Sequence, residues 1–252
     1  MKNNFFSKNK FINIYEKSSL KSKVSSQILY GENFKILSKK KNWLKIRTSF
    51  DKYTGYIKEI NFIKELIPTH KIFKQKTQIF KKSYKKKKYK TNNFLSFASK
   101  ISIIEENRIF AKYEKDKWIK KSDIIKINHI EKNYIKIFKL FLNTKYAWGG
   151  KSYRGIDCSA ILQLFYYYNN KFYPRDTKDQ IKFSKNNLQQ KKFKKGDIIF
   201  WEGHVAVCIN STQLIHAYGP KKKVLIMPIN YTIKKIAKTT NLKIKKISNI
   251  LN

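Results

Sequence analysis

Cys158 and two histidines are the residues of this sequence whose types and spacing could support nucleophilic chemistry. Cys158 follows a glycine-containing turn and Asp157, and it begins an apolar segment, CSAILQLFYYY, that predicts a helix. The free N–H groups and the dipole at a helix N-terminus stabilise a thiolate, so we expect the pKa of this thiol to be lowered. A thiolate that attacks a carbonyl also needs an acid and base partner.

His204 and His216 can provide that partner. His204 begins the segment HVAVCIN, and His216 lies in the next segment, QLIHAY; both segments predict β-strands. If the two strands pair antiparallel, both imidazoles lie on one face of the sheet, where one acts as acid and base and the other orients it. Cys208 shares the strand face of His204 and is expected in the core, and His70 and His129 are expected to be structural or exposed.

The elements that must position these residues belong to the C-terminal half. The segment NYIKIFKLFLNT has apolar residues at helical spacing, and the helix that begins at Cys158 follows it after the turn YAWGGKSYRGID. Strand-like segments come next: GDIIFW, HVAVCIN, QLIHAY and KVLIMPI. Helices followed by an antiparallel sheet predict an α+β domain over residues 131–252.

The N-terminal half predicts short strands. Residues 11–66 contain alternating apolar residues broken by Gly, Asn and Lys clusters, and residues 71–127 repeat this pattern more weakly. Two copies of about 55 residues predict two small all-β barrels, over residues 1–66 and 67–130. The inward positions expected for the first copy are Val24, Ile28, Phe34, Ile36, Leu44, Ile46, Tyr56 and Ile57.

The net charge of +41 raises the question of an anionic partner. Arginine, whose planar fork binds bidentately, is the usual residue for phosphate and base recognition. Here almost all of the 57 basic residues are Lys, spread over every segment. They accompany much Asn, Ile, Tyr and Phe, which indicates AT-rich codon usage. We therefore expect no nucleic-acid partner.

The N-terminal sequence and the few cysteines bear on location and cofactors. MKNNFFSKNKFINIY has no apolar run long enough for a signal peptide. No stretch approaches the roughly 20 apolar residues of a membrane span, so we expect a cytoplasmic protein without one. With two Cys and four His, we expect neither a disulfide framework nor a metal site, and no organic cofactor. The oligomeric state is not indicated.

Residues 144–229 resemble the NlpC/p60 family of cell-wall cysteine peptidases, whose catalytic domain is papain-like. YAWGGKSYRGIDCSAILQLFY is similar to the family's turn, nucleophile and nucleophile helix, and YPRDTKDQ to the arginine–aspartate segment after it. KKGDIIFW resembles a strand entry, and HVAVCIN and LIHAYG resemble the two histidine strands. The resemblance implies that Cys158 is the nucleophile, His204 the general base and then acid, and His216 the residue that orients His204.

The same resemblance implies further site residues. Tyr146 corresponds to a family tyrosine that helps to polarise the scissile carbonyl. Asp157 and Ser159 flank the nucleophile, and the backbone N–H groups of the nucleophile and of Ser159 could form an oxyanion site. Asp176 and Thr177 match an aspartate–serine pair that contacts the free end of the substrate in some members, with Thr in place of Ser.

The N-terminal half is similar to the bacterial SH3-like domains that accompany this peptidase. LYGENFKIL, NWLKI and DKYTGYIKE follow one another in the order expected of the first such domain. Relatives with two of these domains look like γ-D-glutamyl dipeptidyl-peptidases that trim recycled murein peptides. In them, an acidic residue and a tyrosine of the first domain bind the free amino terminus of the substrate, and Glu32 and Tyr53 are the candidates here.

The sequence thus predicts a cysteine peptidase that hydrolyses the bond between γ-D-glutamate and a diamino acid in murein-derived peptides, releasing L-alanyl-γ-D-glutamate. Three alternatives stay open. The first is an exported endopeptidase that acts on intact murein, and the second is a diverged thiol amidase or acyltransferase on the same fold. The third is a basic nucleic-acid-binding protein.

Overall fold

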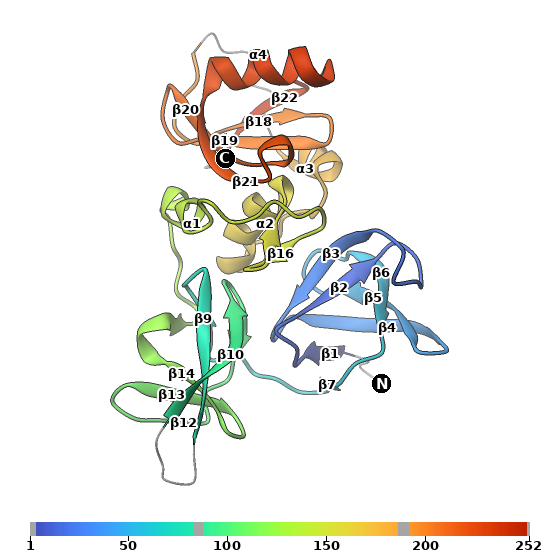
Figure 1. Ribbon diagram of the computed structural model, residues 1–252, viewed down its shortest axis with the longest axis vertical. Helices are drawn as coiled ribbons and strands as arrows, with labels where there is room; N and C mark the ends of the chain where they lie inside the picture. Colours follow the sequence, from blue (N-terminus) through green and yellow to red (C-terminus); the bar gives the residue numbers. More distant parts are fainter. Residues whose placement is uncertain (1–3, 83–87, 186–191, 251–252) are drawn as a thin grey trace. The chain divides into compact units, whose positions relative to one another are not determined.

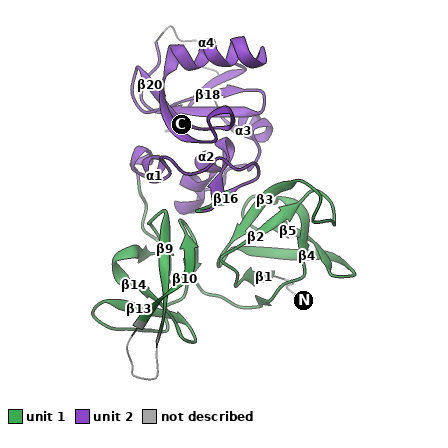
Figure 2. Ribbon diagram, viewed as in Figure 1, with its two compact units in different colours: residues 1–131, 151–153 green, residues 132–150, 154–252 purple. Residues whose placement is uncertain are grey.

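The computed structural model describes residues 4–82, 88–185 and 192–250. The chain divides into two compact units: unit 1 comprises residues 1–131 and 151–153, and unit 2 comprises residues 132–150 and 154–252 (Figure 2). The boundary after residue 131 lies next to the predicted start of the α+β domain. Across the described part of the chain, no helix is both long enough and apolar enough to cross a membrane.

The first β region of unit 1, residues 4–66, is an antiparallel seven-stranded sheet in the order β3-β2-β6-β5-β4-β1-β7 (Figure 1). Its strands are β1 (Asn4–Ser7), β2 (Phe11–Tyr15), β3 (Val24–Leu29), β4 (Asn33–Lys40), β5 (Trp43–Thr48), β6 (Thr54–Lys58) and β7 (Phe62–Ile63). The predicted all-β character of this region is confirmed.

The core of the first β region follows from the two-residue period of its strands. It contains Ile12, Ile14, Ile28, Phe34, Leu44, Ile46 and Ile57. Of the other expected inward positions, Ile36 is half-buried and packs against this cluster, whereas Val24 and Tyr56 are half-buried and do not belong to it. Tyr56 adjoins Ile57 in β6, and neighbouring strand residues point to opposite faces, so only one of the two can face the core.

The second β region, residues 67–130, contains a five-stranded sheet, β10-β9-β14-β13-β12, and a three-stranded sheet, β11-β8-β15. The strands are β8 (His70–Ile72), β9 (Lys76–Lys82), β10 (Lys88–Ser96), β11 (Lys100–Ile101), β12 (Glu105–Glu106), β13 (Phe110–Glu114), β14 (Lys117–Lys120) and β15 (Ile124–Lys126), with a 3-10 turn, η1 (Lys121–Asp123), before the last. This region also matches the predicted all-β character.

The two β regions share one turn. Tyr30 follows β3 in the first region, yet its side chain belongs to the buried cluster of the second region, and its carbonyl accepts the N–H of Lys100 at 3.0 Å. Gly31 has φ +74°, and a Cβ added there would lie 1.9 Å from the carbonyl oxygen of Lys100. Only glycine therefore allows this close approach.

Unit 2 places helices before an antiparallel sheet, and one more helix ahead of its last strand; the sheet has the order β21-β20-β19-β18-β22 (Figure 1). Its helices are α1 (Tyr134–Leu140), α2 (Cys158–Tyr168), α3 (Thr177–Phe183) and α4 (Ile229–Thr240), with a 3-10 turn, η2 (Gly219–Lys221). Its strands are β17 (Gly155–Ile156), β18 (Asp197–Trp201), β19 (His204–Cys208), β20 (Gln213–Tyr218), β21 (Lys223–Pro228) and β22 (Lys246–Asn249); β16 (Lys151–Ser152) falls in unit 1. The predicted α+β class is confirmed.

Helices cover both sides of this sheet, which lies between α2 and α4 in Figure 1. Helix α2 is buried over nearly its whole length because β19 and β20 pack against it, as does α1, through the aromatic contact of Phe138 with Phe165. Helix α4 contributes Ile229 and Ile236 to a cluster that contains Cys208, which is fully buried as predicted. The start of α2 and the start of β19 are thereby held in a rigid core.

Candidate active site

Cys158 is the first residue of α2, and the thiol is almost completely buried. Asp157 is the N-cap, with extended backbone and a side chain that accepts the N–H of Ala160 at 2.8 Å. This cap ends the turn and starts the helix at the cysteine. The Cys158 sulfur lies 3.9 Å from the carbonyl oxygen of Gly203, and the backbone N–H of Val205 donates to it. The sulfur is therefore adjacent to the start of β19.

The Cys158 thiol is protonated at neutral pH. Burial raises its pKa to about 11, and the nearby carboxylate of Asp157 acts in the same direction. The Val205 N–H, the charge of Arg175 and the hydroxyl of Thr177 oppose this shift without cancelling it. The expectation of a lowered thiol pKa was wrong. The sequence indicates that Cys158 begins a helix, but it does not indicate that the sulfur is buried, and burial has the larger effect on the pKa. The thiol consequently needs a base to become nucleophilic.

His204 and His216 meet on adjacent antiparallel strands, as predicted. Nε2 of His204 lies 2.9 Å from Nδ1 of His216. His216 is completely buried, and its ring stacks on that of Tyr218 with centroids 4.7 Å apart. Burial lowers the pKa of His204 to about 4, and it lowers the pKa of His216 well below its usual range. Both imidazoles are neutral at pH 7.

Met227 determines which nitrogens of this pair carry protons. Its sulfur lies 3.3 Å from Nε2 of His216, and a thioether can accept a hydrogen bond but cannot donate one. The proton of neutral His216 therefore belongs on Nε2, which leaves Nδ1 as an acceptor. His204 must then donate from Nε2, so its own Nδ1 is unprotonated. Nδ1 of His204 is the nitrogen that is free to take a proton.

Asp157 is also fixed by a buried ion pair. Arg175 forms a bidentate fork with it: Nη1 donates to Oδ1 at 3.0 Å and Nη2 donates to Oδ2 at 2.7 Å. Nη1 also donates to the hydroxyl of Ser159 at 2.9 Å, and the N–H of Gly149 donates to Oδ2 of Asp157 at 2.9 Å. The turn before the nucleophile and the first turn of α2 are thus joined through one guanidinium.

The other residues of unit 2 that the resemblance implies lie near this centre. Tyr146 is half-buried with its ring against Gly219; burial raises the pKa of its hydroxyl, with a further contribution from Cys158, so the hydroxyl keeps its proton. Thr177, the first residue of α3, is buried and its hydroxyl donates to the Cys158 sulfur. Asp176 is the N-cap residue of α3, and burial raises the pKa of its carboxyl.

Glu32 and Tyr53 belong to unit 1. Glu32 is 1% exposed, and its Oε1 and Oε2 accept from Nζ of Lys151 at 2.9 and 3.0 Å. Oε2 also accepts the N–H of Leu29 at 2.9 Å. A substrate ammonium could reach this carboxylate only in competition with Lys151. Tyr53 is half-buried at the edge of the first core, and its hydroxyl donates to the carbonyl of Ser25 at 3.5 Å.

Three residues that had no predicted role of their own support this centre: Met227, and Arg175 and Gln180 from the matched segment YPRDTKDQ. Gln180 is fully buried and its amide nitrogen donates to the carbonyls of Ser159 and Pro174 at 3.0 and 2.9 Å. A signal for Arg175 was present, since arginine is scarce in a chain that otherwise uses lysine. For Met227 there was none, because methionine in a strand is ordinarily a core residue.

Comparison with known proteins agrees with this geometry. Residues 143–241 match the NlpC/P60 family, and residues 10–59 match the bacterial SH3 domain family. The chain is 23% identical over 229 residues to dipeptidyl-peptidase 6 of Lysinibacillus sphaericus, covering 81% of this chain and 84% of that protein. It is 25% identical over 241 residues to the γ-D-glutamyl-L-lysine dipeptidyl-peptidase of Bacillus cereus, covering 83% and 72%.

A solved structure gives the same fold. The crystal structure of an NlpC/P60 family protein from Bacillus cereus superposes with a TM-score of 0.83 and covers 99% of this chain and 100% of that one, at 19% identity. The predicted fold class is therefore confirmed across the described residues. The chain carries a domain of the NlpC/P60 peptidase family behind an all-β region that contains a bacterial SH3 domain.

Proposed function

We propose that this protein is a cysteine peptidase that hydrolyses the bond between γ-D-glutamate and a diamino acid in murein-derived peptides, releasing L-alanyl-γ-D-glutamate. The observation that carries the proposal is the position of the Cys158 sulfur at the start of the strand that holds His204. The names of both relatives support the peptidase class, and the name of the Bacillus cereus relative supports a γ-D-glutamyl substrate. Murein-derived peptides are accordingly the proposed partners.

The acylation step begins from a neutral pair. Nδ1 of His204 takes the thiol proton while the Cys158 sulfur attacks the γ-carbonyl carbon, so a C–S bond forms and the carbonyl oxygen gains a negative charge. A general base is required because burial holds the thiol in its protonated form. The backbone N–H groups of Cys158 and Ser159 and the hydroxyl of Tyr146 are the proposed donors to that oxygen.

The remaining steps return the enzyme to its starting state. The His204 imidazolium protonates the amine of the diamino acid as the C–N bond breaks, leaving a thioester on Cys158. Water then attacks the thioester with Nδ1 of His204 as base, which yields the γ-carboxylate and the thiol. His216 acts as a positioning residue, since its Nδ1 accepts from His204 throughout.

The substrate contacts belong to the same proposal. Asp176 and Thr177 lie at the start of α3 and are proposed to contact the free end of the peptide. Glu32 and Tyr53 are proposed to bind the free amino terminus of the L-alanyl residue. Because the ammonium of Lys151 already donates to Glu32, the ammonium of the substrate would share the Glu32 carboxylate with Lys151 or displace Lys151 from it.

The test is mass spectrometry of L-alanyl-γ-D-glutamyl-diaminopimelate after incubation with wild type, Cys158→Ala and Cys208→Ala. We expect wild type and Cys208→Ala to release L-alanyl-γ-D-glutamate and Cys158→Ala to release none. Cys208 is the matched control because it is the second buried cysteine of unit 2. Equal release by Cys158→Ala and wild type would refute the nucleophile. No release by wild type, together with cleavage of another amide by Cys158, would refute the substrate.

A further inference from the structure

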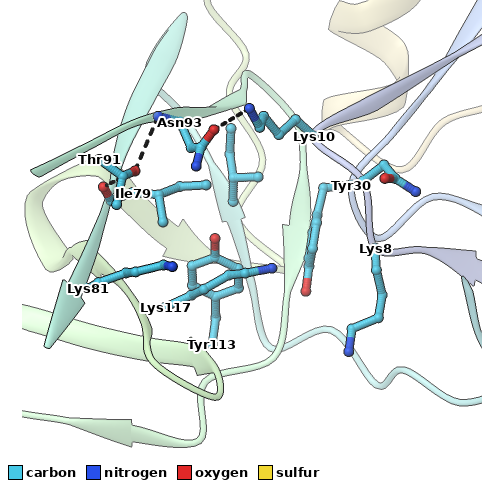
Figure 3. Close-up of a pocket in the computed structure, with 11 residues that line it drawn as sticks. Lys8, Lys10, Tyr30, Ile79, Lys81, Thr91, Asn93, Tyr113 and Lys117 are labelled. Atoms are coloured by element: carbon cyan, nitrogen blue, oxygen red, sulfur yellow. Dashed lines mark hydrogen bonds between the residues drawn. The ribbon is translucent and has the colours of Figure 1, made fainter. Parts of the chain in front are cut away.

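A polar pocket lies within unit 1, at the junction of the two β regions (Figure 3). Its volume is about 190 Å³. A space of this size suits a small molecule and not a folded partner. Four lysines line it: Lys8 and Lys10 from the first region, and Lys81 and Lys117 from the second.

The pocket has an excess of positive charge. Glu114 is the carboxylate that pairs with its lysines, at 2.9 Å from Lys117 and 3.7 Å from Lys8, and it also accepts from the Tyr30 hydroxyl at 2.6 Å. Among the residues that the structure describes, no ion pair joins a carboxylate to Lys10 or Lys81. Four ammonium groups therefore face one carboxylate that is already shared.

A buried hydroxyl points into the same space. Tyr113 is 4% exposed, and its hydroxyl is buried without a hydrogen-bond partner in the described structure. Figure 3 shows this hydroxyl directed toward the pocket, near Ile79 and the lysine side chains. A buried polar group without a partner is costly, so a ligand oxygen that accepts from Tyr113 would remove that cost.

Asn93 adds a further donor. Its Oδ1 accepts from the ammonium of Lys10. An ammonium can only donate, so this bond fixes the orientation of the amide and turns Nδ2 the other way, toward the pocket (Figure 3). Tyr113, Asn93 and Lys81 thus present hydrogen-bond donors from three strands, while Leu95 contributes an apolar wall.

We propose that this pocket binds a small dianion, a dicarboxylate or a phosphate monoester, with its oxygens on Lys81, Asn93 and Tyr113. The excess of positive charge disfavours cationic ligands. The apolar wall favours an anion with a short carbon chain. The site is separate from the peptidase chemistry, because none of its residues belongs to the cysteine centre.

The test is a titration of the full chain with succinate and with inorganic phosphate at constant ionic strength, monitored through the side-chain amide signals in ¹H–¹⁵N NMR spectra. We expect saturable shifts of the Asn93 amide and no saturable shift with uncharged glycerol. Lys81→Gln should weaken binding about fivefold, since it removes one charge in contact with the anion. Lys58→Gln, an equal charge loss at an exposed position of β6, should leave the affinity unchanged within about twofold.

Tyr113→Phe separates binding from a structural role. Since the hydroxyl has no partner, its removal should leave the melting temperature of the unliganded protein unchanged or raised, while binding weakens about threefold. Shifts that stay linear with anion concentration would overturn the proposal. Equal weakening by Lys81→Gln and Lys58→Gln would also overturn it, because the anion would then respond to the net charge alone.

Discussion

Replacing Arg175 tests the claim that one buried guanidinium holds the nucleophile turn in place. Arg175 is 2% exposed and Asp157 is 6% exposed, and the two share a bidentate fork. Arg175→Met would leave the Asp157 carboxylate buried without its counter-charge. Breaking a buried pair in this way costs about 3–5 kcal/mol, a large part of the roughly 5–15 kcal/mol that stabilises a domain. We expect the melting temperature of unit 2 to fall by about 10 °C or more.

The assay is thermal unfolding by circular dichroism, with Arg108→Met as the control. Arg108 is exposed, so the same chemical change there should alter stability by less than about 0.5 kcal/mol. Arg175→Lys should recover only part of the loss, because an ammonium cannot form the fork. The double variant Asp157→Asn, Arg175→Met should be more stable than Arg175→Met alone, since no unpaired charge remains. A loss for Arg175→Met no larger than for Arg108→Met would refute the reasoning.

Three more predictions follow from the site and from unit 1. Burial lowers the pKa of His204 to about 4, so this imidazole binds a proton more tightly in the unfolded chain than in the folded one. The free energy of unfolding should therefore fall as the pH drops from about 6.5 to about 4. His204→Gln should reduce this pH dependence when the free energy of unfolding is measured by urea denaturation at each pH. Met227→Leu keeps the side-chain volume but removes the acceptor for Nε2 of His216, so kcat should fall about fivefold while KM stays unchanged. A change in KM as large as the change in kcat would contradict the assignment of the His216 proton to Nε2. Glu32→Gln should impair the cleavage of peptides with a free amino terminus more than the cleavage of amino-acetylated peptides. If Glu32→Gln and Lys151→Met instead impair the cleavage of both kinds of peptide equally, the role of Glu32 is confined to its ion pair with Lys151.

Much of the fold could be predicted from the sequence because strand and helix periodicities are local. Ile28, Phe34, Leu44 and Ile46 alternate in register with their strands, and each is buried. The error at Tyr56 arose where two neighbouring residues of one strand were both apolar, so composition alone could not assign the face. The insertion of Tyr30 into the second core was not predictable, because it depends on a contact between distant segments.

The candidate site likewise has features that the sequence could predict and features that it could not. Cys158 and the two histidine strands could be located because a helix start and strand pairing have sequence signals. The direction of the thiol pKa could not, because it depends on the burial of the sulfur and on the distance to Asp157. The role of Met227 likewise depends on a single 3.3 Å contact across paired strands.

The shared turn at Tyr30 has a consequence for how the two β regions unfold. A side chain of one region that completes the core of the other makes their stabilities interdependent, as does the bond from Lys100 to the Tyr30 carbonyl. The two regions are therefore expected to open as a single foldon, with similar amide-exchange protection in β5 and β13. A cut between residues 66 and 67 would not release two autonomous domains. It would expose the apolar cluster that Tyr30 completes in the second region.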